Sequence, residues 1–258
     1  MIEPRDLIVV KLGGMTLAEE HDTLADVARG ADRYAIVLVH GGGKRLTDWM
    51  ARLGLEARFE AGRRVTDDDA LELAMGVLGG IVNGEIVAEL LRLGVPAVGM
   101  TGIDGRLLDA RRVPGLGRVA HVVGARPQVL YAPLAGGLVP VVAPLALDED
   151  DVICNVNADE AAAGLAGALG ATLILLTDTD GVQDAGGHRL DRLDELTAEQ
   201  LISEGVISGG MIPKVQGALA ALRSGSPEVV IADGRRPGAL LAALDEPAFG
   251  TRLAAAAE

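Results

Sequence analysis

The chain has 258 residues, 49% of them hydrophobic, which is enough to bury the core of one or two domains. Its 23 basic and 37 acidic residues give a formal net charge of −14, so no excess of positive charge is available to neutralise phosphates. Aromatic residues make up only 2%, too few for a surface that stacks RNA bases. We therefore expect neither a nucleic acid nor an anionic membrane as a partner.

No targeting or membrane-spanning segment is expected. Residues 1–6 are too few and too charged for a signal peptide. The uncharged stretch 127–147 is long enough to span a bilayer, but prolines interrupt it repeatedly. The single cysteine, Cys154, excludes an internal disulfide and fits a reducing compartment. These features predict a cytoplasmic protein.

Short apolar runs alternate with longer helical patterns along the chain. Apart from Lys11 the runs are apolar throughout, so we expect both faces of each strand to be covered. Strands of this kind separated by helices predict an α/β fold, in which a mainly parallel sheet lies between layers of helices. An N-terminal lobe is expected to give way to a C-terminal lobe near residues 167–170. The runs are residues 7–12, 35–39, 97–100, 139–142, 173–176 and 229–231.

One long helix is predicted over residues 67–93. Its central part, residues 73–82, is apolar on all sides, so we expect burial on all sides. Three glycines lie within this part, and each costs a helix about 1 kcal/mol, which suggests that another backbone approaches closely. Internal packing and a subunit interface both remain open. Further along, Thr197 and Gln200 predict a capping box at a helix start.

Two of the expected strands end in glycines. Gly13 and Gly14 follow the first strand, and Gly41, Gly42 and Gly43 follow the second. Glycines at the carboxyl ends of parallel strands allow backbone N–H groups to approach an anion. Neither cluster has the spacing of a Walker A or a Rossmann motif. A tight turn without a ligand is the commoner use of such glycines.

Two lysines stand near glycine-bearing turns. Lys11 lies in an otherwise apolar strand, where an ammonium group is costly to bury unless an anion meets it. Lys214 follows residues 209–213 at an expected helix start. A solvated lysine is the simplest interpretation of its spacing alone.

Other polar groups stand at expected helix starts. Asn155 and Asp159 open a helix after a hydrophobic stretch, where both residue types are ordinary caps. Arg63 and Arg64 precede the long helix, and one of these guanidinium groups could hold a carboxylate through two hydrogen bonds. A solvent-exposed arginine is the alternative.

Together these motifs resemble the amino acid kinase family, and within it the members that phosphorylate N-acetyl-L-glutamate. The resemblance implies a three-layer αβα sandwich, with lobe 1–167 binding the acyl amino acid and dimerising and lobe 168–258 binding ATP. It also implies ATP-dependent phosphorylation of the γ-carboxylate of N-acetyl-L-glutamate in arginine biosynthesis, which gives an acyl phosphate and ADP. The matching segments are 11–14, 40–43, 64–66, 155–159, 177–182, 209–214, 233–235 and 250–251.

The resemblance also implies roles for individual residues. Lys11 and Lys214 would contact the transferring phosphoryl group from opposite sides, with Asp159 holding both. Arg64 would bind the α-carboxylate of the substrate, and Asn155 its α-amide. Backbone N–H groups that bind phosphate and substrate would come from Gly13, Gly14, Gly42 and Gly43. The nucleotide pocket would be lined by Asp178, Thr179, Asp180, Gly181, Val182, Gln183, Val206, Ile207 and Ser208.

Magnesium should accompany ATP and be held mainly by the nucleotide phosphates, because no dedicated metal site is visible in the sequence. Only about six residues precede the first strand, whereas hexameric relatives that arginine inhibits carry an additional N-terminal helix. We therefore expect a homodimer that is insensitive to arginine, joined partly through residues 73–82.

Two other functions remain open. A kinase for carrier-protein-linked α-aminoadipate in lysine biosynthesis has the same chemistry, and residues 100–106 are compatible with it. A catalytically silent sensor of amino acids or nucleotides on the same fold belongs to a different class. The joint presence of Lys11, Asp159 and Lys214 argues against the sensor, because binding alone does not need two lysines at the transferring group.

Overall fold

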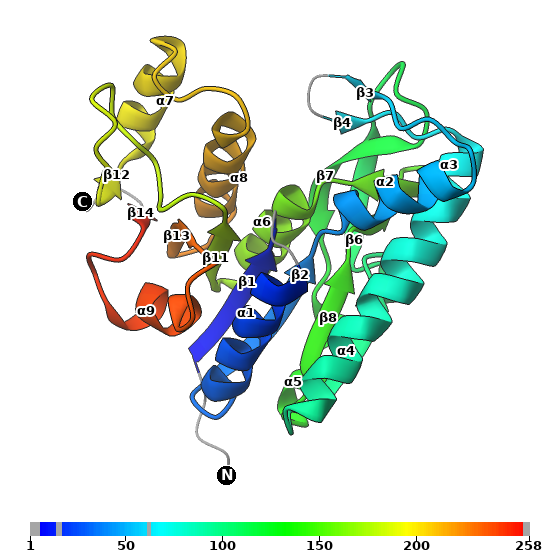
Figure 1. Ribbon diagram of the computed structural model, residues 1–258, viewed down its shortest axis with the longest axis horizontal. Helices are drawn as coiled ribbons and strands as arrows, with labels where there is room; N and C mark the ends of the chain where they lie inside the picture. Colours follow the sequence, from blue (N-terminus) through cyan, green and yellow to red (C-terminus); the bar gives the residue numbers. More distant parts are fainter. Residues whose placement is uncertain (1–5, 14–16, 61–62, 255–258) are drawn as a thin grey trace.

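The computed structural model describes residues 6–13, 17–60 and 63–254, without the side chains of residues 17–21. A central 8-stranded sheet carries helices on both faces (Figure 1). Its strand order is β12-β14-β13-β11-β1-β2-β8-β5, and every neighbouring pair is parallel except β13 and β14. The predicted α/β fold with a mainly parallel sheet is confirmed. The strands are β1 (Asp6–Leu12), β2 (Tyr34–His40), β5 (Ala97–Thr101), β8 (Val139–Ala143), β11 (Thr172–Thr177), β12 (Arg192–Leu193), β13 (Glu228–Asp233) and β14 (Thr251–Ala254).

The six apolar runs all lie in strands of this sheet. Neighbouring residues of a strand point to opposite faces, and in β1 Val9 packs in one core cluster while Ile8 and Val10 pack in the other. Because both faces are covered, the strands show no alternation of polar and apolar residues.

Helices form a layer on each face of the sheet. The core on one face includes side chains from α1 (Leu17–Gly30), α2 (Gly43–Arg52), α3 (Asp68–Ala74), η1 (Met75–Val82), α4 (Asn83–Arg92) and α9 (Ala239–Asp245). The core on the other face includes side chains from α5 (Gln128–Ala135), α6 (Ala158–Leu169), α7 (Glu195–Ser203) and α8 (Met211–Arg223). The result is a three-layer αβα sandwich.

A smaller β structure lies beside the sheet. Four strands form a closed barrel in the order β10-β7-β6-β9, and a short antiparallel hairpin is made by β3 and β4. Its two strands are β3 (Phe59–Glu60) and β4 (Arg63–Arg64). The barrel strands are β6 (Leu108–Arg112), which follows the 3-10 turn η2 (Asp104–Arg106), β7 (Val119–Ala125), β9 (Leu145–Leu147) and β10 (Ile153–Val156).

The predicted long helix is present, but it is not buried on all sides. It runs over Asp68–Arg92, with a π-helical segment in the middle, along one side of the sheet (Figure 1). Val77 and Leu78 are buried, whereas Met75, Gly76 and Gly80 are exposed. By length and composition this one helix among the described residues could cross a membrane, and 44% of its most apolar window is buried. The helix therefore has one apolar face that packs in the core and a second apolar face that its own chain leaves uncovered.

The expected capping box at Thr197 is wrong. Helix α7 begins two residues earlier, and the side chain of Asp194 accepts the hydrogen bond from the backbone N–H of Thr197 at 2.8 Å. An aspartate is as good an N-cap as a threonine. Because Asp194 stands three residues before Thr197, its side chain accepts the hydrogen bond from the backbone N–H of Thr197. Thr197 therefore lies within the first turn of the helix and is not its N-cap.

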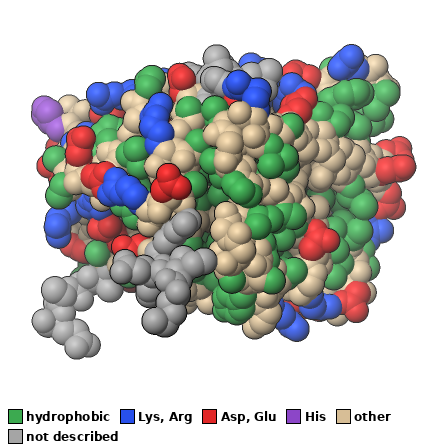
Figure 2. Space-filling view, turned by 90° about the horizontal axis from the view of Figure 1, so that it is seen from below, with side chains coloured by type: hydrophobic (Ala, Val, Ile, Leu, Met, Phe, Trp, Pro, Cys, Tyr) green, Lys and Arg blue, Asp and Glu red, His purple; other side chains and the backbone are tan. Residues whose placement is uncertain are grey.

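Charged side chains of both signs are interspersed over the face shown in Figure 2. Acidic groups stand beside basic ones there, rather than separated into a field of one sign. An arrangement of this kind gives little long-range attraction for a polyanion.

Candidate active site

Lys11 is buried at the carboxyl end of β1, near the middle of the sheet. Its side chain is on the same face as that of Val9, because the two residues are two positions apart in a strand. This is the face covered by α6 and α8. There the ammonium nitrogen of Lys11 lies 2.8 Å from Oδ1 of Asp159. The anion that the sequence required for a buried lysine is supplied by α6.

Asp159 also contacts the second predicted lysine. Its Oδ2 lies 3.6 Å from Nζ of Lys214, which projects from the first turn of α8. Asp159 stands in the first turn of α6, where the side chain of Asn157 accepts a hydrogen bond from its backbone N–H at 2.7 Å. The structure therefore brings all three predicted catalytic residues together. One carboxylate is shared by two ammonium groups from β1 and α8.

Burial and charge act on this trio in opposite directions. Burial alone would raise the pKa of Asp159, but Lys11 and Lys214 lower it below its ordinary value. Burial lowers the pKa of Lys11, and the nearby Lys214 lowers it further, while Asp159 opposes both effects. Additional negative charge at this place would stabilise the protonated form of Lys11. The trio is therefore suited to receive an anionic ligand.

The two glycine clusters follow neighbouring strands at the same edge of the sheet, because Leu12 of β1 pairs with His40 of β2. Gly13 directly follows β1, and Gly14 lies outside the described residues. Gly42 is the N-cap of α2 and has a φ of 124°, a conformation that favours glycine. A Cβ at residue 42 would also come within 2.8 Å of a methyl group of Leu78. This close packing places the free N–H groups at the start of α2 beside the end of β2.

A cavity of about 180 Å³ lies next to the second glycine turn. Arg64 is buried there, with Nη2 donating to the carbonyl of Gly43 at 2.8 Å and to Oγ1 of Thr47 at 2.7 Å. Its guanidinium stacks over the ring of Phe59 at 4.7 Å. Burial lowers the pKa of Arg64. The lining residues are Gly41, Gly43, Leu46, Phe59, Arg63, Arg64, Leu78, Val119, Pro144, Asn155, Val156, Asn157 and Ala158.

Three of the four predicted acceptor residues line this cavity, namely Gly43, Arg64 and Asn155, and Gly42 adjoins it in the chain. The side-chain amide of Asn155 donates to Oγ1 of Thr66 at 3.3 Å. Sequence reasoning assigned no acceptor role to Asn157, which also lines the cavity. The sequence shows Asn157 as a possible helix cap. An asparagine that only caps a helix cannot be distinguished, from the sequence, from one that also lines a cavity.

The predicted nucleotide residues begin directly after β11. Asp178, Asp180 and Gln183 are exposed, whereas Gly181 and Val182 are buried. Thr251 fixes this turn, because its Oγ1 accepts the backbone N–H of Val182 at 2.8 Å. A Cβ at residue 181 would lie 2.4 Å from the same oxygen. The turn is therefore rigid at its base and open at its exposed side chains.

The second predicted nucleotide segment is anchored in the same core. Ile207 is buried in one hydrophobic cluster with Val182, while Val206 is half-buried and Ser208 is exposed. Thr179 has a buried hydroxyl without a hydrogen-bond partner among the described residues. In that part of the chain no three His, Cys, Asp or Glu side chains gather as a metal site would require.

The chain is similar to known proteins over most of its length. A model of the amino acid kinase family matches residues 6–233. The chain belongs to this family. The acetylglutamate kinase of Rubrobacter xylanophilus is 46% identical over 246 residues, which cover 95% of each chain. The acetylglutamate kinase of Solibacter usitatus is 43% identical over 255 residues, covering 96% of this chain and 99% of that one.

Solved structures of other proteins share the fold. The N-acetylglutamate synthase of Neisseria gonorrhoeae, complexed with coenzyme A and N-acetyl-glutamate, superposes with a TM-score of 0.81 at 25% identity, covering 98% of this chain and 60% of that one. These matches confirm the resemblance that the motifs indicated, to the amino acid kinase family and within it to the acetylglutamate kinases.

Proposed function

We propose that this chain transfers the γ-phosphoryl group of ATP to the γ-carboxylate of N-acetyl-L-glutamate, a reaction of arginine biosynthesis. The products are N-acetyl-L-glutamyl 5-phosphate and ADP. The observation that carries the proposal is the trio in which Asp159 pairs with Lys11 at 2.8 Å and with Lys214 at 3.6 Å. The choice of acceptor rests on the acetylglutamate kinases, which match over nearly the whole chain.

The reaction needs charge neutralisation more than proton transfer. A γ-carboxylate has an ordinary pKa of about 4.3, so it is ionised at neutral pH and needs no general base. It is repelled by the γ-phosphate, and two like charges about 4 Å apart at an effective dielectric constant of about 20 cost about 4 kcal/mol. Lys11 and Lys214 offset this repulsion, and their charge is most effective where negative charge builds up in the transition state.

The acceptor binds in the cavity beside the second glycine turn. There Arg64 holds the α-carboxylate and Asn155 the amide, while N–H groups at the start of α2, from Gly42 and Gly43, donate to the substrate. The volume of about 180 Å³ is of the right order for an amino-acid derivative. The carboxylate to be phosphorylated then faces the trio of Lys11, Asp159 and Lys214.

ATP binds in the lobe formed by residues 168–258. Its phosphates meet the N–H groups of Gly13 and Gly14, and its nucleoside contacts the turns at 178–183 and 206–208. Magnesium is held mainly by the phosphates and supplies further charge neutralisation when bound. ATP is plentiful in the cytoplasm, where we place the enzyme.

Two copies of the chain associate through the exposed face of the long helix. Gly76, Gly80 and Gly84 follow each other at intervals of four residues, so they share one face of the helix. Each is exposed, and a Cβ at any of them would meet nothing within 4 Å in its own chain. The exposed Met75 and Leu91 add apolar surface to the same helix. A second copy would cover this surface, which explains an apolar composition that one chain leaves uncovered.

Trapping the product with hydroxylamine tests the proposed activity. The purified chain, ATP and Mg²⁺ are incubated with N-acetyl-L-glutamate, and with glutamate, aspartate and an N-blocked α-aminoadipate in parallel. We expect a hydroxamate from N-acetyl-L-glutamate only, and none from the Lys214→Ala variant. Product from the aminoadipate derivative alone would indicate the lysine-pathway kinase. No product from any acceptor would indicate a silent sensor.

A further inference from the structure

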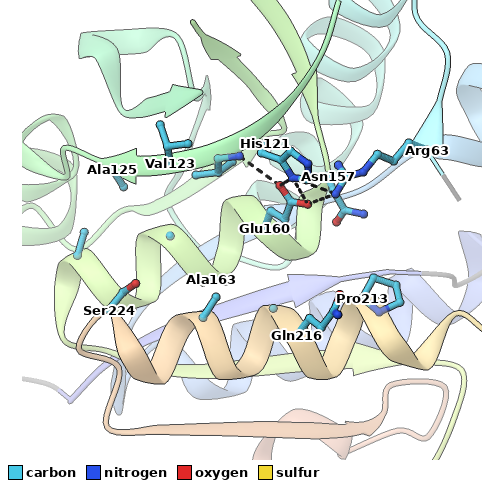
Figure 3. A pocket seen from close by; sticks show the side chains of 16 residues that line it. Arg63, His121, Val123, Ala125, Asn157, Glu160, Ala163, Pro213, Gln216 and Ser224 are labelled. Carbon is cyan, nitrogen blue, oxygen red and sulfur yellow. Dashed lines mark hydrogen bonds and ion pairs between the residues drawn. The ribbon is translucent and has the colours of Figure 1, made fainter. Parts of the chain in front are cut away.

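A second cavity is larger than the acceptor pocket. It has a volume of about 450 Å³ and lies between β7 on one side and α6 and α8 on the other (Figure 3). Arg63 and Asn157 line both this cavity and the acceptor pocket. Arg63 therefore stands at the boundary between the two.

A cluster of three polar side chains occupies one end of this cavity (Figure 3). Nη2 of Arg63 donates to Oε1 of Glu160 at 2.5 Å and lies 3.1 Å from Nδ1 of His121. The same His121 nitrogen lies 3.3 Å from both oxygens of Glu160. The backbone N–H of Val122 donates to Oε2 of Glu160 at 3.2 Å. Glu160 thus joins three elements, namely the β3–β4 hairpin, strand β7 and helix α6.

Each partner of this ion pair adjoins a residue of the proposed site. Arg63 precedes Arg64, and because neighbouring strand residues point to opposite sides, Arg64 reaches α2 while Arg63 reaches α6. Glu160 follows Asp159, which holds the two lysines. The bond between Arg63 and Glu160 therefore connects the acceptor-binding arginine with the helix turn that organises the reacting centre.

The pair of Arg63 and Glu160 is largely buried, and its surroundings leave one polar group without a hydrogen-bond partner among the described residues. The side chains of Arg63 and Glu160 are only 22% and 23% exposed. Nη1 of Arg63 is buried and has no hydrogen-bond partner in the part of the chain that the structure describes. A buried donor without a partner lowers stability. A cost of this kind is typical of sites where position matters more than stability.

We propose that Arg63 and Glu160, supported by His121, are positioning residues that set the place of Arg64 relative to the lysine trio. The inference rests on the proposed function, since it assigns Arg64 to the acceptor. Without the ion pair, strand β4 is held to α6 by no other side-chain hydrogen bond or ion pair found among the described residues. The two-residue strand would then sample other positions, and Arg64 would meet the acceptor carboxylate less often.

Steady-state kinetics of Arg63→Gln and Glu160→Gln test this inference. We expect the KM for N-acetyl-L-glutamate to rise about tenfold, within the range of coupling between contacting residues. The kcat and the KM for ATP should stay within about twofold, because the lysine trio is unchanged. The double variant Arg63→Glu, Glu160→Arg should recover most of the loss. Glu195→Gln is the matched control, since it breaks the exposed pair with Arg223 on α7 and α8.

Hydrogen–deuterium exchange of the segment 58–66 gives a readout that does not depend on activity. We expect faster exchange there in Glu160→Gln than in the wild type and in Glu195→Gln. An unchanged KM, or a KM raised equally by Glu195→Gln, would overturn the inference. So would unchanged exchange, even if the wild type phosphorylates N-acetyl-L-glutamate. If the wild type makes no acyl phosphate, the proposed function fails instead, and the exchange result still decides whether the pair positions the hairpin.

Discussion

The ammonium nitrogen of Lys11 lies where a side chain at residue 13 would begin. A Cβ built on Gly13 would come within 1.8 Å of Nζ of Lys11. Residue 13 needs no unusual backbone angle, so glycine is required here for space. Asp159 holds the ammonium from the other side at 2.8 Å. The lysine is thus confined between a carboxylate and a bare backbone.

Replacing Gly13 by alanine should therefore displace the Lys11 ammonium. We expect kcat to fall about 100-fold, since a misplacement of about 1 Å at a reacting centre can have this effect. The melting temperature should change by only a few degrees, because the lysine end can move. Gly124→Ala in β7 is the control, since a Cβ there would make only ordinary contacts. Full activity in Gly13→Ala would show that the close contact is not needed.

The Asp159 carboxylate should make stability depend on acidity. Its pKa in the folded chain lies below the ordinary 3.8, so it stabilises the fold above that pH and the contribution is lost as the pH falls through the lower folded value. Asp159→Asn should reduce the free energy of unfolding by about 3 kcal/mol at pH 7, because the buried ammonium group of Lys11 and the half-buried one of Lys214 lose their partner. Urea denaturation between pH 7 and pH 3 measures the free energy of unfolding of the wild type and of Asp159→Asn. The difference should be constant down to about pH 4 and shrink below it.

A buried histidine supports the second glycine turn. Nδ1 of His40 donates to the carbonyl of Gly41 at 2.8 Å, and Nε2 accepts from the amide of Asn83 at 3.1 Å. Asn83 also donates to the carbonyl of Val141 at 2.9 Å. The partners therefore assign the single proton of the neutral ring to Nδ1. Burial lowers the pKa of His40 from 6.5 to about 4.

This histidine predicts a loss of stability in mild acid. Between pH 6.5 and about 4 the unfolded chain binds a proton at His40 that the folded chain does not. The free energy of unfolding therefore decreases as the pH is lowered through this interval. The shift corresponds to about 3 kcal/mol over that interval. His40→Gln should lack this component. Urea denaturation of both chains at pH 7, 5.5 and 4 measures it, and parallel profiles would contradict the assignment.

The guanidinium of Arg64 should be needed for the acceptor and not for ATP. Arg64→Lys keeps the charge but loses the fork of donors that matches a carboxylate. We expect kcat/KM for N-acetyl-L-glutamate to fall about 30-fold, which corresponds to about 2 kcal/mol for a hydrogen bond to a charged group. The KM for ATP should not change. If both substrates were affected equally, Arg64 would be holding the fold and not the acceptor.

The exposed face of the long helix predicts the oligomeric state. Gly80→Arg puts a large charged side chain on that face without a clash in its own chain. We expect the wild type to sediment as a dimer and Gly80→Arg as a monomer with unchanged circular dichroism. Gln200→Arg, on the exposed side of α7, should remain dimeric. A dimer in both variants would place the interface elsewhere.

Much of the fold and of the site could be predicted from the order of residues alone. The apolar runs predicted the sheet because a strand covered on both faces cannot tolerate polar residues, and Lys11 was conspicuous as the exception. The motifs around residues 40–43 and 209–214 indicated the family. Local patterns of this kind indicate the environment that each residue requires. A buried ammonium group requires an anion nearby, wherever it lies in the fold.

Which groups meet was decided only by the tertiary structure. Residues 11, 159 and 214 converge because β1, α6 and α8 pack together, and nothing in their spacing specifies 2.8 or 3.6 Å. The pairing of Arg63 with Glu160 likewise depends on how a two-residue strand lies against a helix. Hydropathy could not locate the uncovered face of the long helix, because its exposed face and its buried face are both apolar in composition.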